Sequence, residues 1–137
     1  MEPYRTYSNY LKTKYKEKVY KIPIAIPVTC PNRDGRLGSG GCIFCGSIGA
    51  DYEINAPGTG ITEQINRSIS HIGKKYKAKK FIAYFLNFTA TYTTLANFRS
   101  WAEEAAGHPD VVGLSVSTRP DCIHEKYLDI LKDVQDK

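Results

Sequence analysis

Three short apolar runs alternate with three stretches of helical periodicity, and this alternation restricts the fold more than any other feature of the chain. The apolar runs cover residues 22–29, 81–86 and 111–117, and each is short enough to be a strand. A helix between consecutive strands is the usual connection within a parallel sheet. The order βαβαβα therefore predicts an α/β fold in which the loops after the strands gather at one edge of the sheet.

The helices are predicted from apolar spacing and from their end signals. A helix started by Thr62 or Gly60 carries isoleucines and then Tyr76 at intervals of three or four residues. A second begins at Thr93 or Thr94, and a third follows residue 121, where Asp121 is a candidate cap. Two prolines within residues 22–29 place the first strand at an edge or in an irregular segment.

Size and composition indicate one globular domain. The chain has 137 residues, of which 42% are hydrophobic and 24% charged, values that exclude a wholly disordered, collagen-like or coiled-coil protein. The longest apolar runs are far shorter than the roughly 20 residues of a membrane span. The amino-terminal residues do not resemble a secretory signal, so we expect a cytoplasmic protein with free thiols and no membrane partner.

Positive charge is concentrated in two segments. Residues 1–21 carry a net charge of +4 and residues 74–80 carry +5, whereas the whole chain carries +5. Solvated lysines explain this as well as a binding site does, but five tyrosines alternate with the lysines of residues 1–21, and this pattern is typical of RNA contacts. We therefore divide the chain into a basic arm, 1–21, and a folded domain, 22–137. The RNA-contact candidates are Lys12, Lys14, Lys16, Lys18, Lys74, Lys75 and Lys77.

Three of the four cysteines lie close together in the sequence. Cys30, Cys42 and Cys45 follow the first predicted strand in a segment, 30–60, that contains eight glycines, whereas Cys122 lies far along the chain. A long loop of this kind in a compact domain is usually functional. Structural zinc would need a fourth ligand, either Cys122 or a histidine. Three thiolates alone suit an iron–sulfur cluster that keeps one iron without a protein ligand.

Several strings around these cysteines carry a family resemblance. CPNRDG at residues 30–35 and GGCIFC at 40–45 resemble the cluster loop of radical S-adenosylmethionine enzymes, and more narrowly a bacterial family related to the catalytic subunit of Elongator. The similarity extends through residues 85–92 and 113–121 and covers most of the chain. It implies a 4Fe-4S cluster held by Cys30, Cys42 and Cys45. The remaining iron would chelate S-adenosyl-L-methionine, and one electron would cleave that cofactor to a 5'-deoxyadenosyl radical.

The resemblance also implies cofactor contacts. Phe44 would lie near the adenine, although an anchoring role in the loop explains it equally well. Many radical enzymes of this type carry a Gly-Gly-Glu turn after the second strand, and this chain has a polar string there instead, with Leu86 and Ala90 departing from the family pattern. The cofactor-binding candidates are Phe44, Thr89, Thr91, Tyr92, Ser117 and Arg119.

Relatives in that family build a partial barrel of about six βα units, and this sequence supplies three. The resemblance therefore implies that residues 22–137 form the first half of a (β/α)6 radical S-adenosylmethionine barrel, completed by a second chain if the product is not truncated. It also implies an electron donor and modification of a tRNA wobble uridine. The alternative is a non-catalytic zinc- or RNA-binding module, or an inactive remnant.

Overall fold

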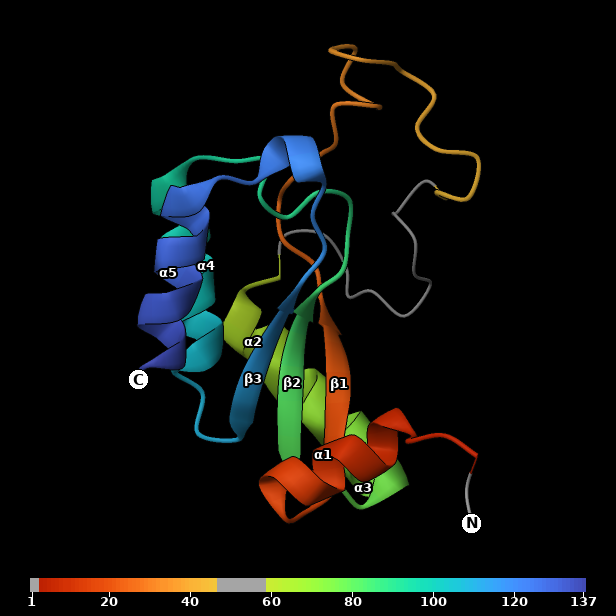
Figure 1. The fold of residues 1–137 in the computed structure, drawn as a ribbon, viewed down its shortest axis with the longest axis vertical. Coiled ribbons are helices and arrows are strands. Elements are labelled where there is room, and N and C mark those ends of the chain that lie inside the picture. The colour runs from red at the N-terminus through yellow and green to blue at the C-terminus, as the bar shows by residue number, and fades with distance from the viewer. Residues whose placement is uncertain (1–2, 47–58) are drawn as a thin grey trace.

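The protein is an α/β structure built on a three-stranded parallel sheet, seen here in a computed structural model that describes residues 3–46 and 59–137 (Figure 1). The strands are β1 (Val19–Ile24), β2 (Lys80–Phe85) and β3 (Val111–Val116), in the order β1-β2-β3. Both pairings are parallel, with a register irregularity beside Phe81 and Ile82. The predicted α/β class with a parallel sheet is confirmed, and the sheet has β1 and β3 at its edges.

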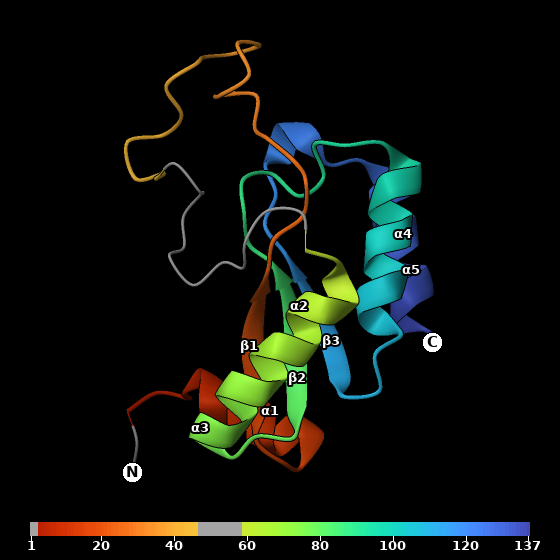
Figure 2. The ribbon, with the colours of Figure 1, turned by 180° about the vertical axis from the view of Figure 1, so that it is seen from behind.

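Three helical segments connect or follow the strands. The first is α2 (Ile61–Ser68), which continues through a π-helical turn (Ile69–Gly73) into α3 (Lys74–Tyr76). The others are α4 (Leu95–Ala106) and α5 (Glu125–Gln135). Figure 2 shows α2 and α3 crossing the sheet, with α4 beside α2 and α5 packed against α4.

The main core lies between this helical layer and one face of the sheet. Phe81 and Phe85 point into it from β2, Ile22 and Ile24 from β1, and Phe98 from α4, all with no exposed surface. Alternate strand residues face the same side, so one strand contributes to two faces. Fully burying a side chain of this size contributes about 1.5–3 kcal/mol, so these residues hold the layers together.

The opposite face is covered near the amino ends of the strands by α1 (Tyr7–Tyr15), which the sequence analysis did not predict (Figure 1). Thr6 caps this helix by accepting a hydrogen bond from the Asn9 N–H at 3.1 Å. Leu11 then packs with Val19 and Ile82 in a second small cluster. The proposed boundary at residue 21 therefore falls inside β1, and residues 19–21 belong to the sheet.

Two sequence predictions are corrected. The first strand was expected over residues 22–29 but begins three residues earlier, at Val19, and ends at Ile24. It ends there because side chains, rather than a neighbouring strand, bind the main chain of Ala25 and Ile26. Asp121 does not cap the last helix, whose N-cap is His124 without a side-chain cap bond. Instead Asp121 lies in a 3-10 turn, Pro120–Cys122, and pairs with Arg119.

No helix in the described ranges is both long and apolar enough to cross a bilayer.

Candidate functional site: the carboxyl edge of the sheet

Two buried amides fix the path by which the chain leaves β1 toward the cysteines. Gln64, which is 1% exposed, donates to the carbonyls of Ala25 and Thr59 and accepts from the Ala25 N–H, all at 2.8 Å. The Asn87 side chain makes the same kind of pair with the main chain of Ile26, accepting from its N–H at 3.0 Å and donating to its carbonyl at 2.7 Å. Each amide replaces the partner that a neighbouring strand would supply.

The segments that follow the three strands are hydrogen-bonded to one another. The Thr89 N–H donates to the Thr29 carbonyl at 3.3 Å, and the Ala90 N–H donates to the Ser117 carbonyl at 2.9 Å. The side chain of Ser117 shares a 3.0 Å hydrogen bond with the Tyr84 hydroxyl. The sequence prediction that these loops gather at the carboxyl edge of the sheet is therefore confirmed.

The cysteine loop, by which we mean residues 30–46, begins at this edge and extends away from it (Figure 1). Its first turn closes on the Cys30 carbonyl, which accepts from the Arg33 N–H at 2.8 Å. Gly41 has a φ of +72°, a left-handed conformation that favours glycine, and a Cβ there would lie 2.9 Å from the end of the Arg33 side chain, which would have to shift. Arg33 in turn donates to the Gly46 carbonyl at 3.1 Å.

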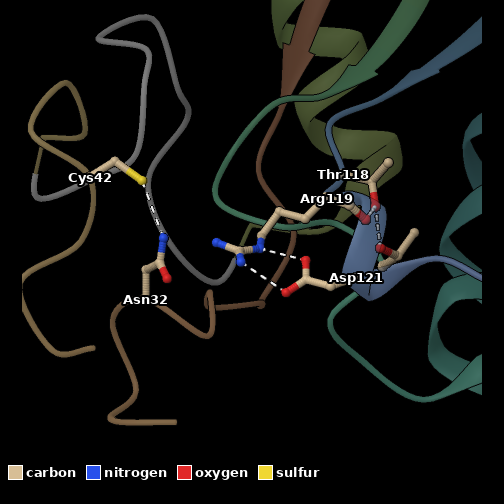
Figure 3. A network of polar contacts seen from close by, with 6 residues as sticks. Asn32, Cys42, Thr118, Arg119 and Asp121 are labelled. Carbon is tan, nitrogen blue, oxygen red and sulfur yellow. Dashed lines mark hydrogen bonds and ion pairs between the residues drawn. The ribbon is translucent and has the colours of Figure 1, made fainter. Parts of the chain in front are cut away.

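Cys42 and Cys45 are joined by a tight turn in the outer part of the loop. The Cys45 N–H donates to the Cys42 carbonyl at 2.9 Å, and the Asn32 side-chain amide donates to the Cys42 sulfur at 3.4 Å (Figure 3). Between them Ile43 and Phe44 project into solvent, with Phe44 76% exposed. Neither side chain anchors the turn in the core.

The segment after β2 contacts the inner part of this loop. The Tyr92 hydroxyl donates to the Asp34 carboxylate at 2.7 Å, and the Arg33 guanidinium lies 5.0 Å from the centroid of the Phe88 ring. Phe88 has a φ of +51°, a left-handed conformation that costs a bulky residue about 1–2 kcal/mol. The Tyr92–Asp34 hydrogen bond and the Arg33–Phe88 contact hold this segment against the cysteine loop and offset the cost of the Phe88 conformation.

Cys30 lies in surroundings that favour its thiolate. Burial alone would raise the pKa of Cys30, but hydrogen bonds to the Thr89 side chain and the Asn32 backbone, together with the charge of Arg119, lower it below the ordinary value. Thr89 itself is 2% exposed. The thiolate is the form of cysteine that binds metals, and a lowered pKa increases the thiolate fraction.

Arg119 approaches Cys30 from the end of β3. Its guanidinium makes a bidentate pair with Asp121, at 2.8 and 2.9 Å, and the side chain extends toward the side on which Asn32 and Cys42 lie (Figure 3). The hydrogen bond from Arg119 lowers the pKa of Asp121 to about 2. Burial and the neighbouring Asp121 charge raise the pKa of Cys122, which is the opposite of the effect on Cys30.

The four cysteines are free, and each is half-buried. Within residues 3–46 and 59–137, no three cysteine, histidine or carboxylate side chains lie close enough to share one ion. The donor set nonetheless fits a thiolate-bound cluster, since Cys30 is held at the sheet and Cys42 and Cys45 are paired by one turn. In the described structure the Cys42–Cys45 turn and Cys30 do not converge on one point.

Most of the predicted cofactor contacts come together. Thr89 and Arg119 lie beside Cys30, and Ser117 is hydrogen-bonded to Tyr84 and Ala90. Thr91 is hydrogen-bonded to Thr118, and Tyr92 contacts the cysteine loop. Phe44 lies apart from them on the exposed turn. The sequence analysis missed Gln64 and the pairing of Asp34 with Tyr92, because neither has a local signal.

The predicted RNA-contact lysines lie at the opposite, amino end of the sheet, where Figure 1 shows α1 and α3. They come from α1, from the connection between α1 and β1, and from α3 and the residue after it, and all are exposed.

Comparison with known proteins finds sequence relatives of greater length. The chain is 34% identical to protein YhcC of Escherichia coli over 127 residues, covering 93% of this chain and 40% of YhcC. It is 35% identical to YtqA of Bacillus subtilis over 135 residues, covering 98% of this chain and 42% of YtqA. It is 36% identical to MJ0486 of Methanocaldococcus jannaschii over 129 residues, covering 93% of this chain and 38% of that protein.

No family model and no solved structure matches the chain. The chain spans about two fifths of the length of the curated relatives it matches.

Proposed function

We propose that this chain is the cluster-binding part of a radical S-adenosylmethionine enzyme, with Cys30, Cys42 and Cys45 as the ligands of a 4Fe-4S cluster. The observation that carries the proposal is the setting of Cys30. Its thiol lies at the carboxyl edge of a parallel sheet, with its pKa lowered by Thr89, Asn32 and Arg119, at the start of the glycine-rich loop that holds the other two cysteines. Ligands commonly bind at this edge in α/β proteins.

When bound, such a cluster supplies one electron to the sulfonium of S-adenosyl-L-methionine. The residues of this chain would position and shield that chemistry. Asn32 donates to the Cys42 sulfur, and such hydrogen bonds tune cluster potentials. Arg119 carries positive charge beside Cys30 and offsets the negative charge of bound thiolates. Phe44, exposed on the turn, is available to cover the cofactor once the loop closes.

The fold that accompanies this function is the first half of a (β/α)6 barrel. The edge strand β3 supports it, because none of its six residues is charged or fully buried. A hollow of about 610 Å³ runs along that edge, lined in part by Leu114, Val116 and Leu131. Uncovered apolar edges of parallel sheets are rare, so we propose that a further parallel strand covers this one, supplied by a second polypeptide or by further residues of a longer protein.

The proposed substrate is a tRNA wobble uridine, and an electron donor is the second partner required. Support for RNA comes from the exposed lysines and tyrosines at the amino end of the sheet. The alternative, a zinc- or RNA-binding module without catalysis, is favoured by one observation. Cys122 lies near Cys30, whose charge contributes to the raised pKa of Cys122, and it could serve as a fourth thiolate.

Anaerobic reconstitution followed by metal analysis distinguishes the cluster-binding proposal from the zinc-binding alternative. About four irons and four sulfides per chain, lost in Cys42→Ala and retained in Cys122→Ala, are expected for the cluster. One tightly held zinc that requires Cys122 would refute it in favour of the alternative. Formation of 5'-deoxyadenosine by the reduced protein, assayed with and without the carboxyl-terminal part of a longer relative, then tests cofactor cleavage.

A further inference from the structure

The two basic segments of the sequence meet in space at the amino end of β1. The Lys18 ammonium donates to the carbonyl of Tyr76, and the rings of Tyr20 and Tyr76 stack with their centroids 4.4 Å apart. These contacts join the connection between α1 and β1, and the start of β1, to α3, more than 50 residues away along the chain. Charges that the sequence shows as two clusters therefore form one surface.

Two hollows flank the edge strand on this surface. One, of about 490 Å³, lies between β1 and the α2–α3 helix, and the other, of about 560 Å³, lies between β1 and α1. Tyr20 and Lys21 line both, so the hollows adjoin along the edge of β1. We call the two together the β1-edge track. Its basic lining residues are Lys12, Lys18, Lys21, Arg67, His71 and Lys75, and no acidic residue is among the described residues that line it.

Arg67, His71 and Lys75 stand at intervals of four along the helix, which places them on one side of it. Arg67 also pairs with Glu63, but both side chains are more than half exposed. An exposed pair of this kind contributes less than about 1 kcal/mol, so the guanidinium can exchange its partner for a phosphate. The arrangement presents two exposed cations, Arg67 and Lys75, with His71 between them, beside an edge strand.

We propose that the β1-edge track binds the phosphate backbone of the RNA substrate, an inference that rests on the proposed function. Lysine and arginine side chains suit phosphates, and exposed aromatic rings suit unpaired bases. Tyr7 and Tyr10 of α1 stack on each other and are 55% and 39% exposed. The exposed large side chains here are tyrosines rather than the aliphatic residues that would enter a lipid surface.

The basic residues that line the track only partly overlap the lysines predicted from sequence. It retains Lys12, Lys18 and Lys75 and adds Lys21, Arg67 and His71. The predicted lysines that line neither hollow are Lys14, Lys16, Lys74 and Lys77. Exposed lysines outside both hollows and outside the predicted set provide a control with the same change in charge.

The test compares two triple variants for binding of an unmodified tRNA transcript, measured by fluorescence anisotropy across a salt series. The track variant is Lys21→Gln, Arg67→Gln and Lys75→Gln. The control is Lys79→Gln, Lys126→Gln and Lys132→Gln, three exposed positions that line neither hollow and are not among the predicted RNA contacts. We expect the track variant to bind at least about tenfold more weakly and its salt slope to fall by about two to three, with the control nearly unchanged.

Equal weakening by both triples would overturn the track, since only overall charge would then matter, and so would an unchanged track variant. A track variant that loses binding to phosphatidylserine vesicles but keeps tRNA affinity would assign the surface to a membrane instead. Circular dichroism melting checks folding, and the single variant Lys75→Gln, on the exposed end of the helix, repeats the test if the triple unfolds. Iron analysis of the same samples tests the proposed cluster separately, so either proposal can fail while the other stands.

Discussion

Replacing Gln64 by leucine tests whether the buried amides hold the approach to the cysteines. The Gln64 side chain is almost fully buried and makes three hydrogen bonds to the main chain of Ala25 and Thr59. Leucine has a similar volume and fills the same space, but it makes none of these bonds. Gln64→Leu therefore removes the partners without opening a large cavity.

The expected loss follows from the orphaned backbone groups. One N–H and two carbonyls lose the Gln64 side chain as partner, and because these groups are only partly buried each loss costs about 1.5 kcal/mol, toward the lower end of the range for an unsatisfied buried group. The gain from burying leucine instead of an amide offsets about 1–2 kcal/mol. The net destabilisation should be about 3 kcal/mol, which lowers the urea midpoint by about 1.5 M for a slope near 2 kcal/mol per M.

The chain has a single tryptophan, Trp101, which packs partly buried against the core and reports unfolding by its fluorescence. Glu63→Gln on the same helix is the control, because it removes only an exposed ion pair and should cost less than about 1 kcal/mol. Equal urea midpoints for the Gln64→Leu and Glu63→Gln variants would refute the reasoning.

A second substitution at this position gives a pH signature. The carboxyl introduced by Gln64→Glu would face two carbonyl oxygens in a buried site, so its folded pKa should rise above the unfolded value of about 4.3. A raised folded pKa means that stability is highest below that unfolded value and falls as pH rises through the folded pKa. Gln64→Glu should therefore approach the wild-type urea midpoint near pH 4 and fall below it toward pH 7.

Three further outcomes are expected. Iodoacetamide should alkylate Cys30 faster than Cys122 at neutral pH, because the pKa of the first is lowered and that of the second raised; equal rates by peptide mass spectrometry would contradict this. The folded pKa of Asp121, about 2, lies below the unfolded value of about 3.9, so its contribution is present above about pH 4 and lost as pH falls toward 2. Asp121→Asn should flatten the acid limb of the stability profile, and an unchanged limb would contradict the pairing. Gly41→Ala should speed tryptic cleavage of the cysteine loop, because φ there is +72°, whereas Gly40→Ala, in open space without a positive φ, should not.

The parts of the fold that sequence predicted are those with a local cause. Apolar runs and three-to-four spacing depend on neighbouring residues, so the strand and helix order was recoverable. Helix α1 was missed because it buries a single residue, Leu11, and its lysines indicated an exposed arm. The end of β1 was misplaced because it depends on Gln64 and Asn87, which act from 39 and 61 residues away.

The candidate site divides in the same way. The cysteine spacing and the high glycine content identified the loop from the sequence. One of its glycines, Gly41, has a positive φ, a conformation that glycine adopts easily. What sequence could not indicate is which partners the loop residues choose. Asp34 binds Tyr92 across 58 positions, and Asp121 pairs with Arg119 instead of capping a helix, because a bidentate guanidinium competes better than an exposed backbone N–H.

The cysteine loop and the β1-edge track lie at opposite ends of the same strands. A six-residue strand is about 20 Å long, so an RNA bound on the track would need to run along the edge of β1 to bring a base to Cys30. Sites separated by more than about 10 Å without shared partners usually respond independently to mutation. Loss of iron in Cys30→Ala should therefore leave tRNA affinity unchanged, and the track variant should bind a full complement of iron. A variant that disturbs both measurements would mean that the loop and the track are coupled through β1, and the separation of binding from chemistry would have to be abandoned.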